Sequence, residues 1–457
     1  MKCKRLKVVR KLLRKRENNP YLQIALDLVN THRALQIAEE ATKGGVEWIE
    51  AGTPLIKAEG MDIIRKLHKK FPDHTIVADM KTVDGGAIEI EIAAKAGANV
   101  VLMLGGSDDA SVTEAVEAAK KYGVMLGCDT IDIPPKNLVE RAVELEKLGV
   151  DMICSHVGID MQTIYGGEKT LEVAQKLKKN LNPTTWLAIA GGINSETAAK
   201  AKEIGVDVII VGGSLYKSKE PEQTAKKIRS AIESTKPIET ALFKKYDKEH
   251  IREALNLVSC PNISDAMHRS GEMQGLKQVW RGTEEQPFKF VGPAVTVRAY
   301  NGDWSKPVEA IEEAQEGDVI VIDACEGKDA VWGELATWSC KTKGISGVVI
   351  DGAVRDIDDI RKIKFPIYAR HFTPTAGEPR GLGEINVSIE CANMPVNPGD
   401  WIVGDDSGVI VIPKEKAQEM ANRAIDVFEK ENRIREEIKR GSTLSEVMYL
   451  KKWEKQK

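Results

Sequence analysis

The chain has 457 residues, too many for one ordinary hydrophobic core, and this length predicts two domains of about 200 residues each. Its composition, 42% hydrophobic and 30% charged, is typical of a globular protein, and a net charge of −3 provides no general attraction to nucleic acid or to acidic membranes. No apolar run reaches the roughly 20 residues of a membrane span, and no signal-type apolar segment follows the basic N-terminus. Seven scattered cysteines without a CxxC pair are typical of a reducing cytoplasm, with neither a disulfide framework nor a zinc site.

Residues 1–20 form a basic N-terminal extension. The first 16 residues contain nine Lys or Arg and no acidic residue. Leu6, Val9 and Leu13 recur at helical spacing, which predicts an amphipathic helix. Because no aromatic residue is interleaved with the cations, a solvated helix on the domain surface is favoured over contact with nucleic acid or a membrane.

From residue 21 to residue 234, short apolar runs alternate with amphipathic helical stretches. Eight such runs occur at intervals of roughly 25 residues, and strands this apolar are expected to be buried on both faces of a parallel sheet. Eight βα units in about 210 residues predict a (β/α)8 TIM barrel, whereas an open doubly wound sheet usually has about six strands and a glycine-rich first turn. The runs are 22–28, 46–52, 75–81, 99–104, 123–129, 151–157, 186–192 and 207–213.

Charged and polar residues lie at the ends of these runs, which is where TIM barrels carry their active sites. Convergent carboxylates suit Mg²⁺, which keeps water molecules that a substrate can displace. A metal and an ammonium group together would stabilise an enediolate formed next to a carbonyl. The candidates are Asp27, Glu50, Asp79, Lys81, Asp84 and His156.

Paired glycines follow the last two strands, as Gly191-Gly192 and Gly212-Gly213. Without side chains they let backbone N–H groups approach a phosphate ahead of a helix N-terminus, the usual phosphate position in this fold. A single strand-end Asp often serves only as a helix cap, and a glycine pair often only as a turn. Because polar residues or glycine pairs stand at the ends of six of the eight runs, the pattern favours a site for a phosphorylated substrate. The glycines would bind its phosphate, and a proton would be removed or a carbon bond broken at the other end of the substrate.

The segment ADMKTVD (78–84) contains Asp79-x-Lys81-x-x-Asp84, the motif of the orotidine-5′-phosphate decarboxylase suprafamily. Residues 20–215 resemble this suprafamily, which includes 3-hexulose-6-phosphate synthase and 3-keto-L-gulonate-6-phosphate decarboxylase.

The segments IEAGTPLIKAEG (49–60) and SHVGIDMQ (155–162) favour the synthase. The keto-gulonate enzyme would have arginine at the position of Ile159, and the decarboxylases tend to have arginine at the position of Gly213. The segment IYGGEK (164–169) departs from the synthase pattern.

The resemblance implies an aldolase that interconverts ribulose 5-phosphate plus formaldehyde and 3-hexulose 6-phosphate. It implies that Glu50 and Asp79 bind Mg²⁺. Lys81 would stabilise the enediolate, and Asp27 would hold substrate hydroxyls.

Two further roles complete the implied site. His156 is the candidate general acid/base, since an unperturbed imidazole titrates near neutral pH. In the suprafamily, the residue at the position of Asp84 reaches across a dimer interface, so the resemblance implies dimeric barrels.

Residues 235–247 read as a linker, and residues 248–457 as a smaller α+β domain of the swivelling β/β/α type. Its strands are short and its helices fewer, and a helix from 414 to about 440 closes it. The strand-like runs are 292–300, 317–324, 347–353 and 400–413.

The segment WGELATWSCKTKGISGVVIDGAVRD (332–356), with NISDAM and GPAVTVR, resembles the ribonuclease-activity-regulator-A family, also called demethylmenaquinone-methyltransferase-like. The resemblance covers residues 248–440 and implies trimers. Some members are metal-dependent aldolases or decarboxylases of 2-oxo acids, in which an acidic residue and an Arg-Asp pair, separated by twenty residues, form the site. Glu334 and Arg355-Asp356 have this spacing, although the characterised aldolases have Asp at the first position.

By this comparison, Arg355 would clamp the carboxylate of a 2-oxo acid and Asp356 would ligate Mg²⁺. The Arg355-Asp356 pair could equally be a structural salt bridge in an assembly module.

Three hypotheses therefore stay open. The chain is a bifunctional enzyme, or a barrel enzyme with a trimerisation or regulatory module, or the barrel is a keto-gulonate-phosphate decarboxylase. The expected protein is a cytoplasmic homo-oligomer of dimeric barrels and trimeric second domains, without nucleic-acid or membrane partners.

Overall fold

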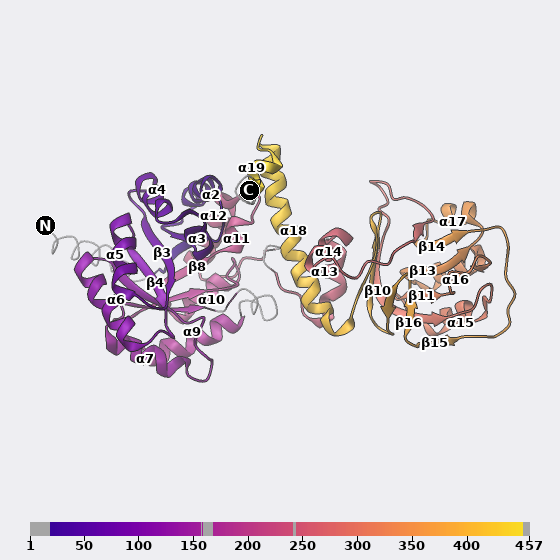
Figure 1. Ribbon diagram of the computed structural model, residues 1–457, viewed down its shortest axis with the longest axis horizontal. Coiled ribbons are helices and arrows are strands. Elements are labelled where there is room, and N and C mark those ends of the chain that lie inside the picture. Colours follow the sequence, from indigo (N-terminus) through magenta and orange to yellow (C-terminus); the bar gives the residue numbers. More distant parts are fainter. Residues whose placement is uncertain (1–18, 157, 159–167, 241–243, 451–457) are drawn as a thin grey trace, which may run out of the picture. The chain divides into compact units, whose positions relative to one another are not determined.

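The computed structural model describes residues 19–156, 158, 168–240 and 244–450 and divides the chain into two compact units (Figure 1). One unit combines the chain up to Lys245 with the chain from Glu429 onward, and the other is Tyr246–Phe428. Most of the predicted basic extension lies outside the described residues. None of the described helices has the length and apolar character that crossing a bilayer requires.

The first unit contains a closed barrel of eight parallel strands in sequential order, as the sequence predicts. The strands are buried on both faces because nearly every residue in them is apolar. They are β1 (Tyr21–Leu26), β2 (Trp48–Ala51), β3 (Thr75–Thr82), β4 (Val100–Leu104), β5 (Met125–Asp129), β6 (Met152–His156), β7 (Trp186–Ala190) and β8 (Val208–Val211).

Helices surround the barrel, and their ends follow from local sequence. Asn30 caps the first of them by accepting a hydrogen bond from the backbone of Arg33, and glycines with positive φ such as Gly97 and Gly123 end others. The helices are α2 (Thr31–Lys43), α3 (Thr53–Glu59), α4 (Asp62–Lys70), α5 (Gly86–Ala96), α6 (Asp109–Tyr122), α7 (Leu138–Leu148), α9 (Glu168–Asn180), α10 (Thr197–Ile204), α11 (Gly213–Tyr216) and α12 (Pro221–Ser234).

Aromatic rings close the amino end of the barrel interior. The rings of Tyr21 and Trp48 lie 5.3 Å apart, and that of Trp186 lies 6.0 Å from each of them. These residues begin β1, β2 and β7, so the inward positions further along the strands are left for smaller or polar side chains. The polar side chains of the strands, such as Glu50, Asp79 and Asp129, lie toward the carboxyl ends.

The second unit is built on a mixed sheet in the order β19-β18-β10-β11-β13-β14-β9, which agrees with the predicted α+β class. Four central strands are parallel, and the flanking strands are antiparallel. Its strands are β9 (Lys277–Gln278), β10 (Lys289–Arg298), β11 (Val319–Asp323), β12 (Ala330–Trp332), β13 (Gly347–Val354), β14 (Ile367–Phe372), β15 (Glu384–Ile385), β16 (Ile389–Cys391), β17 (Met394–Val396), β18 (Trp401–Asp405) and β19 (Gly408–Ile412). Its helices are η1 (Lys248–His250), α13 (Ile251–Leu257), α14 (Cys260–Ala266), α15 (Ser305–Glu313), α16 (Glu334–Lys343), α17 (Ile357–Ile363) and η2 (Lys414–Lys416).

The C-terminal helix α18 (Ala417–Lys439) lies where the sequence predicts a helix, but it does not belong wholly to the second domain. Apolar residues of its first half, such as Ala421 and Ile425, pack in the core of the second unit. From Glu429 onward the chain, including α19 (Leu444–Met448), groups with the barrel. The second compact unit therefore ends at Phe428, within α18, and charged residues later in this helix pair with barrel residues.

Candidate active site

Three carboxylates from neighbouring strands converge inside the carboxyl end of the barrel. Glu50 lies in β2 and Asp79 in β3, both buried, and the partly buried Asp27 directly follows β1. Burial, followed by the charge of Asp79, raises the pKa of Asp27. Burial and then the charges of Asp79 and Asp27 raise the pKa of Glu50 well above its usual range. The three carboxylates thus repel one another in a medium that solvates them poorly.

Two buried polar side chains orient these carboxylates. The side-chain amide of Gln23, which lies in β1 four residues before Asp27, donates to Glu50. The hydroxyl of Thr53, at the start of α3, donates to Oδ2 of Asp79 at 2.8 Å. Glu50 and Asp79 are therefore each oriented by a neighbouring side chain before any substrate binds.

Lys81 lies between two carboxylates. Its Nζ is 3.0 Å from Oδ2 of Asp79 and 2.7 Å from Oδ2 of Asp129, which ends β5. Burial lowers the pKa of Lys81, but the two carboxylates together outweigh burial and raise it. The residue has a φ of 47°, and the register of β3 with β4 shifts between Asp79 and Thr82. This irregularity aims the ammonium group at the carboxylates.

Asp129 also holds the candidate acid/base. Nδ1 of His156 lies 2.7 Å from the same Oδ2 of Asp129 that contacts Lys81. Burial opposes ionisation of Asp129, but His156 and Lys81 outweigh it and lower the pKa of Asp129 to about 2. Asp129 is therefore an anion that contacts both the ammonium group of Lys81 and the imidazole of His156.

The paired glycines lie next to the carboxylates. Gly191 and Gly192 both have positive φ, and the Ser214 hydroxyl donates to the carbonyl of Ile193 at 2.7 Å, which ties the two glycine turns together. A Cβ on Gly212 would lie 3.7 Å from Oδ2 of Asp27. The backbone where a phosphate is expected thus adjoins the side chain expected to hold sugar hydroxyls.

The predicted residues of the second unit also come together. Oδ2 of Asp356 accepts from the backbone N–H of Glu334 at 3.1 Å and from Nε of Arg355 at 3.3 Å. Asp356 has a φ of 58°, and a Cβ on Gly333 would lie only 2.6 Å from its Oδ2. The Arg355 and Asp356 side chains are both partly exposed, so a ligand could reach them.

Two family models match the chain. Residues 20–228 match the model described as orotidine 5′-phosphate decarboxylase/HUMPS family, and residues 260–411 match RraA-like, described as Aldolase/RraA. An uncharacterized protein of Methanocaldococcus jannaschii is 42% identical over 205 residues, which are 44% of this chain and 96% of that protein. The 3-hexulose-6-phosphate synthase of Mycobacterium gastri is 37% identical over 211 residues, which are 46% of this chain and 99% of that enzyme.

The N-terminal half of the chain belongs to the orotidine 5′-phosphate decarboxylase/HUMPS family. A solved structure of a 3-hexulose-6-phosphate synthase has 36% sequence identity to the chain and a TM-score of 0.43, and the match covers 46% of this chain and 99% of that one. The HUMPS-family barrel is an enzyme of the lyase class, similar to 3-hexulose-6-phosphate synthases. The second unit contains an RraA-like domain. Both resemblances inferred from the motifs are thereby confirmed.

One residue of the HUMPS-family site, Asp129, is absent from the candidates that the sequence suggests. It ends the fifth apolar run just as Asp79 and His156 lie at the ends of theirs, so the strand-end rule could have found it.

One predicted residue, Asp84, does not join the cluster of its own barrel. It is exposed, and its Oδ1 accepts from the backbone of Gly85 at 2.6 Å. Ile159 and most of 164–169 lie outside the described residues, so of the two positions that separate the synthase from the decarboxylases only Gly213 is described.

The donors of the HUMPS-family site fit a hard divalent cation. They are carboxylate oxygens whose mutual repulsion a cation would relieve, and they are already oriented by Gln23 and Thr53. Among the described residues, no cluster of three or more His, Cys, Asp or Glu side chains has the arrangement of a complete metal site. Mg²⁺ commonly takes only one or two protein carboxylates and fills its remaining positions with water or substrate oxygens.

Proposed function

We propose that the barrel is a Mg²⁺-dependent aldolase that interconverts ribulose 5-phosphate plus formaldehyde and 3-hexulose 6-phosphate. The observation that carries the proposal is the position of Lys81 between Asp79 and Asp129, with His156 on the same Asp129 oxygen. This arrangement puts the ammonium group of Lys81 and the imidazole of His156 beside the carboxylates that would bind the metal ion. The similarity to synthases over nearly their whole length supports the same reaction.

Glu50 and Asp79 are the residues that would hold Mg²⁺, which supplies positive charge for the oxygens of an enediolate when it is bound. Asp27 would accept hydrogen bonds from sugar hydroxyls. The backbone N–H groups at Gly191-Gly192 and Gly212-Gly213 would bind the phosphate.

His156 and Lys81 would act on the reacting carbon and its oxygen. His156, with Nδ1 fixed by Asp129, would use Nε2 to take the proton from C1 of ribulose 5-phosphate. Lys81, kept protonated by its two carboxylates, would stabilise the enediolate oxygen that this step creates. C1 would then form a bond with the carbon of formaldehyde, and the formaldehyde oxygen would take up a proton to become the new hydroxyl. The reverse sequence releases formaldehyde.

A second copy of the chain would complete the site. Asp84 points away from its own cluster and is exposed beside Val83 and α5, where Ile88 has 64% and Ile92 42% of its surface exposed. Exposed apolar side chains next to a motif carboxylate suit a homodimer interface through which Asp84 enters the partner's site.

For the RraA-like domain, we propose a metal-dependent aldolase or decarboxylase acting on a 2-oxo acid. Arg355 would bind the substrate carboxylate, and Asp356, close to the N-terminus of α16, would ligate a metal ion. A trimerisation or regulatory module without catalysis would keep the same Arg355–Asp356 ion pair as a structural contact. The test is turnover of 2-oxo acids by wild type and by Arg355→Ala. Turnover that is lost in Arg355→Ala would support the catalytic function, and no turnover by wild type would support the non-catalytic module.

The test of the barrel is consumption of formaldehyde by the full-length protein with ribulose 5-phosphate, with and without EDTA. We expect consumption that needs Mg²⁺ and is lost in Asp79→Asn. The matched control is Asp73→Asn, an exposed aspartate just before β3. Folded full-length protein that consumes no formaldehyde would overturn the proposal, and decarboxylation of 3-keto-L-gulonate 6-phosphate would then be assayed.

A further inference from the structure

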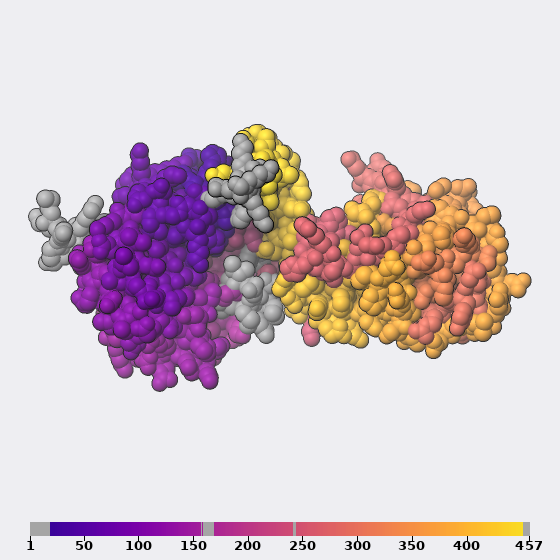
Figure 2. Space-filling view, viewed as in Figure 1, coloured from indigo at the N-terminus to yellow at the C-terminus, as the bar shows by residue number. Residues whose placement is uncertain are grey.

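After the second unit, the chain returns to the barrel as the segment Glu429–Leu450, which we call the C-terminal clamp. In Figure 2 its yellow atoms lie against the indigo surface of the first barrel helices. The clamp contains the last part of α18 and all of α19. Its contacts with the barrel include several ion pairs, and the most buried of these involve one arginine.

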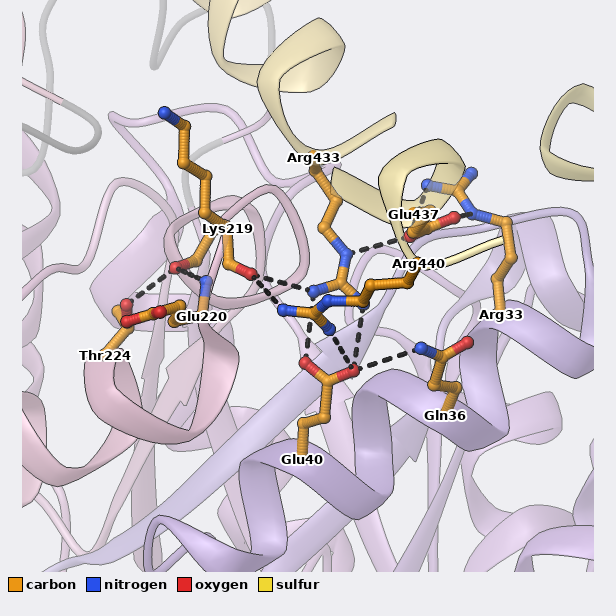
Figure 3. A network of polar contacts seen from close by, with 10 residues as sticks. Arg33, Gln36, Glu40, Lys219, Glu220, Thr224, Arg433, Glu437 and Arg440 are labelled. Carbon is orange, nitrogen blue, oxygen red and sulfur yellow. Dashed lines mark hydrogen bonds and ion pairs between the residues drawn. The ribbon is translucent and has the colours of Figure 1, made fainter. Parts of the chain in front are cut away.

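That arginine is Arg433, whose side chain is only 1% exposed. Its Nη1 and Nη2 lie 3.0 Å and 3.1 Å from the two carboxylate oxygens of Glu40 in α2, a bidentate pair. Its Nε donates to Glu437 of the clamp at 2.8 Å (Figure 3). Burial opposes the charge of Arg433, but the Glu40 and Glu437 carboxylates outweigh burial and raise its pKa.

A second arginine extends the chain of ion pairs. Glu437, 3% exposed, accepts from Nε of Arg33 at 2.7 Å and from Nη2 of Arg33 at 3.2 Å. Arg33 lies in the first turn of α2, and Glu40 two turns later. The charges therefore alternate in the order Glu40, Arg433, Glu437, Arg33, and the clamp is joined to α2 at two points.

The clamp also holds the segment between α11 and α12. The carbonyl of Lys219 accepts from Nη1 of Arg433 at 3.2 Å and from Nη2 of Arg440 at 3.3 Å. Arg440 in addition lies 3.3 Å from Glu40. One cluster of guanidinium groups thus contacts both α2 and the segment that follows α11.

Both held elements lead directly to the active site. The helix α2 begins four residues after Asp27, and its cap Asn30 also donates to the backbone of Glu446 in the clamp at 3.5 Å. The segment at Lys219 follows α11, which is capped by Gly212 and begins at Gly213. Lys81, Asp129 and His156 lie on β3, β5 and β6, whereas the clamp contacts described above fall on α2 and on the segment that follows α11.

We propose that Arg433 is a positioning residue for the barrel reaction, which acts through α2 and the α11–α12 segment on Asp27 and the phosphate-binding turn. The nature of the substrate rests on the function proposed above, but the positioning does not. A buried network of alternating ion pairs specifies geometry more than it adds stability. Its loss should therefore weaken binding of the sugar phosphate and leave the proton-transfer groups in place.

The test compares full-length wild type with Arg433→Met, which keeps the aliphatic length and removes the guanidinium. We expect the KM for ribulose 5-phosphate to rise about tenfold or more, with a much smaller change in kcat and in the KM for formaldehyde. Arg433→Lys should recover part of the loss. Arg435→Met is the matched control. Arg435 is exposed on the same helix, and within the described part of the chain its side chain donates only to Asn432 of that helix. An unchanged KM in folded Arg433→Met would overturn the proposal.

A second readout separates this proposal from the proposed reaction. Amide hydrogen exchange of peptides covering residues 28–40 and 212–224 should be faster in Arg433→Met than in wild type, whatever the substrate. If Arg433→Met does not fold, the triple variant Glu40→Gln, Arg433→Met, Glu437→Gln removes the charges of Arg433 and of both its carboxylate partners together, with little change in side-chain volume. Wild-type protein without synthase activity would refute the reaction alone, whereas unchanged exchange in a folded variant would refute the positioning role.

Discussion

Replacing Asp129 by Asn tests the central arrangement of the site. The substitution keeps the shape of the side chain but removes the negative charge that contacts Nζ of Lys81 and Nδ1 of His156, each at 2.7 Å. Lys81 keeps Asp79 as a partner, so the fold around β3 should persist. The proton carrier and the cation would both lose their orientation.

The magnitude follows from the two contacts that are lost. A hydrogen bond to a charged group contributes about 1.5–3 kcal/mol, so two weakened bonds at the lower figure amount to about 3 kcal/mol. If this energy is expressed in the transition state, kcat/KM falls by about 10²-fold. The loss should appear mainly in kcat, because Asp129 contacts the groups that transfer protons rather than the expected phosphate site.

The assay is the initial rate of formaldehyde consumption at saturating Mg²⁺, with Asp132→Asn as control. Asp132 is an exposed aspartate of the same loop that bonds to the backbone of Gly106. An Asp129→Asn enzyme with a kcat close to that of wild type would refute the role of this carboxylate.

For the same variant, we expect the free energy of unfolding to depend on pH differently from that of wild type. The pKa of Asp129 is lowered to about 2 in the folded chain, below its value in the unfolded chain. Its charge therefore adds stability, about 2 kcal/mol, that is fully present above roughly pH 4 and is lost as the pH falls through about 2. Urea unfolding should find wild type more stable than Asp129→Asn at neutral pH, with a difference that shrinks below pH 4. A difference independent of pH would contradict this account.

Other substitutions test the metal site, the barrel core and the second domain. Glu50→Gln should abolish turnover without lowering the thermal unfolding temperature of the metal-free protein, because a repelling buried carboxylate is removed; Mg²⁺ should raise that temperature in wild type only. Trp48→Ala should cost about 3–5 kcal/mol in urea unfolding, against roughly 0.5 kcal/mol for the half-exposed Trp338→Ala, and equal losses would contradict the packing described. Arg355→Ala should leave formaldehyde consumption unchanged and remove any turnover of 2-oxo acids, and a parallel loss of both activities would argue against separate sites.

The barrel and most of its polar cluster follow from the order of residue types along the chain. Successive side chains of a strand point to opposite faces of the sheet. Where the residues on either side of Glu50 or Asp79 face the surrounding helices, the carboxylate must therefore face the barrel interior. Parallel strands bring all such ends to one rim. For this reason five of the predicted positions, Asp27, Glu50, Asp79, Lys81 and His156, could be assigned to one site before any contact was known.

The position of a residue at a strand end did not by itself show which aspartates belong to the site. Asp129 satisfies this criterion as well as Asp79 does, and only its 2.7 Å contacts with Lys81 and His156 distinguish it. Asp84, within the motif, turns outward because the chain leaves the barrel after Thr82 and enters α5. Distances and directions of this kind depend on how the rim closes, which no local pattern of residues records.

By itself the sequence determined that a (β/α)8 barrel and a second α+β domain would form, that a helix would run from about residue 414 to 440, and which strand ends of the barrel would meet. Only the tertiary structure decided that the end of this helix belongs to the barrel. The partners Glu40 and Arg433 are 393 residues apart, and each is an ordinary charged residue of an amphipathic helix. A periodic pattern indicates which face of a helix is polar, but the choice of partner for a buried charge depends on what the folded chain brings within 3 Å of it.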